Sequence, residues 1–146
     1  MSFHSSFVGK YERSLSRDFR ITLPRHFLAR LGEEFYLLEP PGVRVLRLAP
    51  RAAFEAFVAD LHDAMDAMIE EDETEEFPQE DWDLARTASL TQVDATGRLY
   101  IPTRVRTRAM LHAPCACFLI GALDCVEIWQ RSFYEQVHHH GSRDRA

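Results

Sequence analysis

The residues best suited to chemistry are an aspartate and an arginine in the segment DATGR, Asp94 and Arg98. The aspartate can accept a hydrogen bond from the backbone two residues later, and Gly97 can adopt the positive φ of a tight turn. Strand-like residues flank the segment, so we predict a hairpin turn that projects Arg98. Its guanidinium can either brace the turn by a salt bridge to Asp94 or point outward as a donor of bidentate hydrogen bonds.

The same pattern occurs 78 residues earlier in the chain. LSRDFRITLP at 15–24 aligns with VDATGRLYIP at 93–102, so that Arg20 matches Arg98 and each copy ends in proline. Each copy is followed by a short helix-compatible stretch, two apolar runs separated by a turn, and a further helical stretch. The sequence therefore predicts an α+β fold of two related units, each ordered strand, strand, short helix, strand, strand, helix.

The first copy departs from the second at two turn positions. Ser16 replaces the turn aspartate and Phe19 replaces the turn glycine. Serine makes a weaker turn bond, and a left-handed residue other than glycine costs about 1–2 kcal/mol. We therefore expect the first turn to differ in shape, with Asp18 as its turn residue and Arg20 pointing differently. An exposed Phe19 could then contact a partner.

Charge is distributed unevenly along the 146 residues. The net charge is −6, but residues 60–83 hold twelve carboxylates and no Lys or Arg. Residues 1–31 and 84–112 each sum to +4, and sixteen of the seventeen basic residues are Arg. The two basic segments carry the two motifs, so the acidic overall composition does not argue against a nucleic-acid partner.

Other classes of function find little support in the sequence. Cys115, Cys117 and Cys125 lie in one strand-like stretch, which indicates core packing rather than a disulfide framework or a metal site. We find no motif of an enzyme, and we expect no catalytic residue, cofactor, metal or small-molecule substrate. The longest uncharged apolar stretch has eleven residues, too few to span a bilayer, and the N-terminus has no secretory signal, so the cytoplasm is expected.

The expected organisation has four parts. A first unit covers 1–59, an acidic helix end and linker cover 60–83, a second unit covers 84–137, and a disordered tail covers 138–146. Apolar residues at steps of three and four predict a helix from Pro50 to about Met68. The acidic run beyond that helix is expected to be a solvated spacer between the units.

The duplicated element resembles that of the MraZ family of bacterial transcriptional regulators, whose halves are swapped-hairpin units of the AbrB/SpoVT type. The resemblance covers nearly the whole chain and rests on FVGKY at 7–11, the motifs at 16–24 and 93–102 with Arg86 before the second, and GALDCVEIW at 121–129. It implies tandem swapped-hairpin β-barrel units related by a pseudo-twofold repeat. It also implies a nucleoid-associated repressor that binds double-stranded DNA.

The resemblance further implies a ring-shaped homo-oligomer on short G-rich direct repeats upstream of the division and cell-wall gene cluster. Neighbouring subunits would then compensate for the few contacts that each one makes. Carried over residue by residue, Arg20 and Arg98 are the motif arginines and Arg17 is a basic residue of the first motif. Lys10 and Arg13 are candidates for phosphate contacts.

The turns that support these arginines rest on the side chain of Ser16 in the first copy, and on Asp94 and Gly97 in the second. Two alternatives to a DNA-binding regulator stay open. One is an oligomeric ring that serves as a protein-interaction scaffold and has lost DNA binding. The other is a dimeric antitoxin, which the duplication within one chain disfavours.

Overall fold

The computed structural model describes residues 6–71 and 77–143, so the acidic run at 72–76 lies outside the described residues. The first half of the chain contains β1 (Lys10–Leu15), β2 (Arg20–Thr22), α1 (Arg25–Leu31), β3 (Phe35–Leu38), β4 (Leu46–Pro50) and α2 (Arg51–Glu71). After α3 (Gln79–Thr87), the second half contains β5 (Ser89–Thr91), β6 (Arg98–Tyr100), α4 (Thr103–Arg108), β7 (Cys115–Gly121), β8 (Val126–Gln130) and α5 (Arg131–Arg143). Apart from α3, which spans the end of the expected linker and the start of the second unit, the element order is the predicted one, in an α+β fold.

The six-stranded sheet is shared between the two halves. Its order is β1-β7-β8-β4-β3-β5, and every neighbouring pair is antiparallel. Strand β1 of the first half pairs with β7 of the second, and β5 of the second half pairs with β3 of the first. Each half therefore supplies one edge strand of the sheet, and that strand pairs with a strand of the other half.

A separate two-stranded sheet joins the two motifs. Strand β2 pairs antiparallel with β6, and the register places Ile21 opposite Leu99. Neither side chain has accessible surface. Alternating burial in both strands sends the central residue into the core and leaves the flanking residues toward solvent.

The main core lies between the six-stranded sheet and a layer formed by the small sheet with α1 and α4. The small sheet contributes Ile21 and Leu99, α1 contributes Phe27, α4 contributes Val105, and β7 contributes Leu119 from the larger sheet. Burial of such apolar side chains is the dominant favourable term in folding. It fixes the small sheet, and with it the two turns, relative to the rest of the fold.

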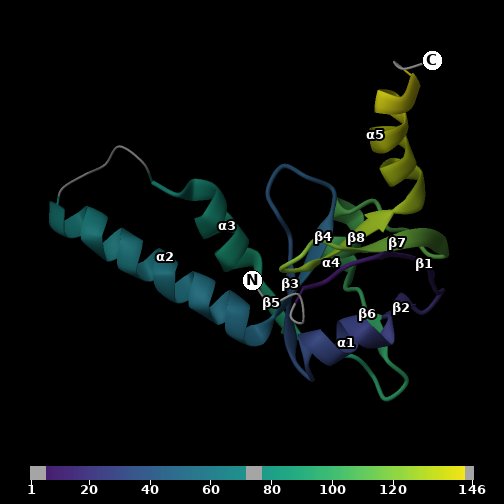
Figure 1. The fold of residues 1–146 in the computed structure, drawn as a ribbon, viewed down its shortest axis with the longest axis horizontal. Helices are drawn as coiled ribbons and strands as arrows, with labels where there is room; N and C mark the ends of the chain where they lie inside the picture. Colours follow the sequence, from purple (N-terminus) through teal and green to yellow (C-terminus); the bar gives the residue numbers. More distant parts are fainter. Residues whose placement is uncertain (1–5, 72–76, 144–146) are drawn as a thin grey trace.

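The opposite face of the large sheet is covered at its two ends by different helices. At the β3–β4 end, Tyr36 packs on Phe54 of α2, and a second core cluster includes residues of α3. At the β7–β8 end, Phe118 packs on Tyr134 of α5. Figure 1 shows α2 and α3 extending together to one side of the sheet, while α5 leaves it at the other end.

Two expectations differ from the structure. The strands that flank each turn pair with other strands and not with each other, because tertiary pairing into the two sheets replaces a simple hairpin. The expected disordered tail from residue 138 is helical up to Arg143, and 144–146 lie outside the described residues. The helix continues because His138 stacks on Tyr134 at 3.9 Å and lies against Trp129.

Two further observations concern the helices and the cysteines. None of the helices in 6–71 and 77–143 is long and apolar enough to cross a membrane. The three cysteines are free thiols, and Cys117 is fully buried in the main core. Its Sγ lies 3.8 Å from that of Cys115.

Candidate nucleic-acid interface

The second turn has the geometry that its sequence predicts. Asp94 Oδ1 accepts hydrogen bonds from Thr96 N–H at 2.9 Å, Thr96 Oγ1 at 2.6 Å and Arg98 N–H at 3.0 Å. The backbone closes with Asp94 N–H donating to the Arg98 carbonyl at 2.9 Å, and Gly97 has φ +79°. The carboxylate thus accepts hydrogen bonds from two backbone N–H groups of the turn. It fixes the point at which Arg98 leaves the backbone.

The first turn has the same backbone shape, so the expectation of a different shape is wrong. Ser16 N–H donates to the Arg20 carbonyl at 2.9 Å, Phe19 N–H donates to the Ser16 carbonyl at 2.9 Å, and Phe19 has φ +65°. Ser16 Oγ accepts from Arg20 N–H at 3.2 Å, as the carboxylate does in the second turn. Phe19 adopts the left-handed conformation at a position where its counterpart is Gly97.

The first turn keeps this shape because its acid and hydroxyl have exchanged places. Ser16 and Asp18 of the first turn correspond to Asp94 and Thr96 of the second. In the first turn Ser16 Oγ donates to Asp18 Oδ1, and in the second Thr96 Oγ1 donates to Asp94 Oδ1. Each turn therefore holds one carboxylate bonded to one hydroxyl. The exchange is visible in the sequence as S-x-D in the first copy and D-x-T in the second. A comparison of the copies one position at a time overlooks it.

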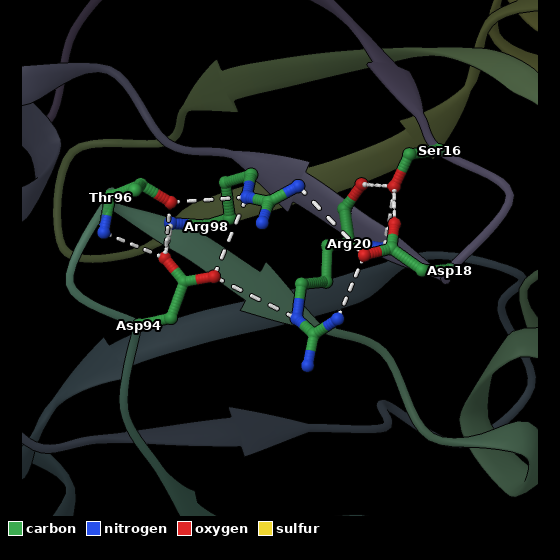
Figure 2. Close-up of polar contacts among 6 residues, drawn as sticks. All are labelled: Ser16, Asp18, Arg20, Asp94, Thr96 and Arg98. Carbon is green, nitrogen blue, oxygen red and sulfur yellow. Dashed lines mark hydrogen bonds and ion pairs between the residues drawn. The ribbon is translucent and has the colours of Figure 1, made fainter.

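The two turns meet in a single charge cluster of Asp18, Arg20, Asp94 and Arg98 (Figure 2). Arg20 contacts Asp18 at 2.8 Å and Asp94 at 3.7 Å. Arg98 contacts Asp94 at 3.4 Å and Asp18 at 3.8 Å. Each arginine therefore lies between its own turn's carboxylate and that of the other turn. Although 78 residues separate the arginines in sequence, antiparallel pairing of β2 with β6 brings both to one site.

The charge cluster is accessible to a ligand. The side chains of Arg20 and Arg98 are 38% and 40% exposed, and those of Asp18 and Asp94 are 47% and 33% exposed. Exposed ion pairs contribute only about 0–1 kcal/mol each. The carboxylates can therefore orient the guanidinium groups while leaving them free to exchange partners.

Both carboxylates are held in the charged form. The hydroxyl of Thr96, followed by the N–H of Arg98, lowers the pKa of Asp94 to about 2. The Ser16 hydroxyl and then the Arg20 guanidinium lower the pKa of Asp18 below its ordinary value. At neutral pH the cluster thus contains two negative and two positive groups in alternation.

The other three basic candidates lie along the first strand and its turn. Arg17 is exposed in the first turn, whereas Arg13 donates to the Glu12 carbonyl at 2.8 Å and lies over the Tyr11 ring. Lys10 begins β1, and its ammonium lies 4.8 Å from the centre of the Phe118 ring. Since a strand advances roughly 3.3 Å per residue, Lys10 lies about 20 Å from the first turn.

Comparison with known proteins places the chain beside one family. A family model described as "MraZ protein, putative antitoxin-like" matches residues 84–144. A protein named Transcriptional regulator MraZ from Treponema pallidum (strain Nichols) is 25% identical over 137 residues, covering 89% of this chain and 83% of that protein. Its namesake from Mycoplasmopsis pulmonis (strain UAB CTIP) is 27% identical over 128 residues, covering 87% and 80%. The relatives therefore match most of the chain.

Proposed function

We propose that this chain, a transcriptional regulator that belongs to the MraZ family, binds double-stranded DNA in a sequence-specific manner through Arg20 and Arg98. The observation that carries the proposal is the charge cluster, in which two turns from distant parts of the chain bring their arginines to one exposed site. Each guanidinium offers a fork that matches the O6 and N7 acceptors of guanine in the major groove. A G-rich target fits two such readers.

The carboxylates of Asp18 and Asp94 have a defined part in this proposal. They fix the direction of each arginine before DNA arrives, which reduces the side-chain entropy lost on binding. On binding, each guanidinium exchanges a solvent-exposed carboxylate partner for a bidentate hydrogen-bond pair to a base. Because exposed ion pairs are weak, this exchange costs little.

Phosphate contacts would come from Lys10, Arg13 and Arg17, which add positive charge along β1 and the first turn. Such contacts set orientation and register without reading sequence. Residues 60–83 carry the opposing negative charge. Those that the structure describes lie on or beside α2 and α3, which extend to one side of the sheet (Figure 1). That arrangement supports DNA approach despite the net charge of −6.

The wider assembly is also part of the proposal. Residues 1–59 and 84–137 form two AbrB/SpoVT-like swapped-hairpin units, with 60–83 linking them. The pairing of β1 with β7 and of β5 with β3 supports an exchange of strands between the units. Copies of the chain assemble in a ring, so that successive charge clusters contact direct repeats upstream of the division and cell-wall genes. Avidity then compensates for the few base contacts of one subunit.

The direct test is fluorescence anisotropy of the purified protein on DNA from upstream of its own gene, against scrambled DNA, across a salt series. We expect a preference for the upstream DNA and a log–log salt slope of about −0.9 per phosphate neutralised. Light scattering on the same sample measures the oligomer. A ring with no DNA affinity at low salt would contradict the proposal and favour the interaction scaffold.

A further inference from the structure

Phe19 holds the most unusual backbone conformation among the candidate DNA-binding residues and their turns. Its φ of +65° lies in the left-handed region, where the matching position of the second turn has Gly97 at +79°. A left-handed backbone places Cβ too close to the following carbonyl oxygen, so residues other than glycine adopt it rarely. The hydrogen bonds within the turn hold its backbone, and a contact from outside the turn can offset the remaining cost of this conformation at Phe19.

Arg106 of α4 supplies that contact. The centre of its guanidinium lies 3.3 Å from the centre of the Phe19 ring, which is a close cation–π arrangement. Arg106 is only 8% exposed, and its Nη2 donates to Thr103 Oγ1 at 2.5 Å. Its Nη1 is buried and has no hydrogen-bond partner among the described residues. The aromatic ring is thus a principal partner of a buried cation.

The second turn contains the reciprocal arrangement. Leu28 of α1 occupies the position that corresponds to Arg106, 78 residues earlier. A Cβ placed on Gly97 would lie 3.3 Å from Leu28 Cδ1. Each turn therefore packs against the short helix of the other half. In one pair the small residue Gly97 faces Leu28, and in the other the large residue Phe19 faces Arg106.

The backbone repeats this exchange. Ile101 N–H donates to the Phe19 carbonyl at 2.9 Å, and Leu23 N–H donates to the Gly97 carbonyl at 3.1 Å. Both donors directly precede the proline of their own motif. The turn that carries Arg20 is therefore held by the second half of the chain through this backbone bond and the Phe19–Arg106 contact, in addition to the exposed ion pairs of the charge cluster.

We propose that Phe19 and Arg106 form a positioning pair that holds the first turn in its left-handed conformation and thereby directs Arg20 toward DNA. This inference rests on the proposed function, because DNA binding is what the direction of Arg20 serves. Neither residue contacts DNA in this proposal. The pair takes the place of the glycine on which the second turn depends.

The first experiment is a rescue measured by anisotropy on the DNA upstream of the gene. Arg106→Ala removes the stacked cation, and we expect affinity to fall about five- to thirtyfold, the population ratio that matches the cost of a left-handed residue. Phe19→Gly/Arg106→Ala should recover most of the affinity, because glycine adopts this conformation unaided. Arg108→Ala is the control for lost charge, since it removes an exposed arginine from the same helix.

Rescue separates positioning from contact. If Arg106 met a phosphate, the double variant would bind as weakly as Arg106→Ala, and the proposal would be overturned. Unchanged affinity in Arg106→Ala would overturn it as well. Arg106→Leu and Phe19→Gly/Arg106→Leu repeat the comparison with the side-chain volume largely kept, in case alanine leaves a cavity that unfolds the protein.

A second experiment does not depend on DNA. Amide hydrogen exchange of Ile101 N–H reports the bond to Phe19, and exchange of Leu23 N–H reports the matching bond of the second turn. Arg106→Ala should accelerate exchange at Ile101 about five- to thirtyfold, leave Leu23 unchanged, and be reversed by Phe19→Gly. Equal acceleration at both amides would overturn the pair. If wild-type protein binds no DNA, the proposed function fails while this measurement still decides the pair.

Discussion

Ile21 and Leu99 lie directly opposite each other in the two-stranded sheet, at matching positions of the two motifs. Because the pairing is antiparallel, Arg20 lies opposite Tyr100 and Thr22 opposite Arg98. The register is therefore the same when the two strands are interchanged, so an approximate twofold rotation about this buried pair relates one turn to the other. It explains why both arginines reach the same charge cluster, and why each turn packs on the other half's helix.

Arg98→Ala should weaken specific DNA binding by about 1–3 kcal/mol for each bidentate hydrogen-bond pair to a base that the substitution removes. Folding should be nearly unchanged, since its ion pairs with Asp94 and Asp18 are solvent-exposed. Anisotropy and a thermal melt measure the two effects separately. Arg51→Ala, which removes two exposed ion pairs at the start of α2, is the matched control. Unfolding of Arg98→Ala would mean that this arginine braces its turn.

Arg20→Ala should weaken binding by a similar amount, about 1–3 kcal/mol for each base that the arginine reads. The reason is the shared backbone shape of the two turns, which directs Arg20 and Arg98 alike. The two single variants are compared on the same DNA at the same salt concentration. Undiminished affinity in Arg20→Ala beside a large loss in Arg98→Ala would show that only the second turn reads sequence.

Asp94 should titrate near pH 2, well below its ordinary value of 3.8. Since the folded pKa is the lower one, its contribution to stability is present above about pH 4 and is lost as the pH falls toward 2. NMR titration of the carboxyl carbon measures the midpoint. Thr96→Val removes the largest cause of the shift and should move the midpoint back toward 3.8. A wild-type midpoint near 4 would contradict the turn geometry.

Gly121→Ala should destabilise the fold by about 1–3 kcal/mol, the usual cost of overpacking. A Cβ there would lie 2.4 Å from the backbone carbon of Phe7, which leaves no room without moving the chain. Hydrogen exchange of Leu123 N–H, which donates to the Phe7 carbonyl at 3.0 Å, should accelerate. Gly32→Ala meets no atom within 4 Å but is strained by its φ of +84°, so it reports backbone strain without overpacking, and the Leu123 amide should respond less to it than to Gly121→Ala.

Arg104→Ala should destabilise the protein by about 1–3 kcal/mol, because it removes the cation that faces a buried carboxylate. Glu39 is 5% exposed, and its Oε2 lies 3.3 Å from Arg104 Nη2. Urea denaturation measures the loss. Adding Glu39→Gln should recover part of it, because a neutral amide costs less to bury than an unpaired charge. No difference between Arg104→Ala and wild type would show that water already compensates Glu39.

Local patterns were sufficient to predict much of the fold and part of the site. The duplicated motif predicted the element order, and the spacing of Phe54, Phe57 and Leu61 predicted α2. The turn of Asp94 and Gly97 was predicted correctly because its hydrogen bonds join residues at most four positions apart. Such features depend on steric preferences and periodicity that a short segment already contains.

By itself, then, the sequence determined most of the helices and strands and identified Arg20 and Arg98 as the matching arginines of the two motifs. Tertiary structure decided their partners: which strands pair, where Arg20 and Arg98 meet, and how far α5 extends. It also decided that Phe19 adopts a glycine conformation, through Arg106, 87 positions away in the chain. Local propensity opposes that conformation, and the contact with Arg106, which forms only when the two halves pack together, offsets part of its cost.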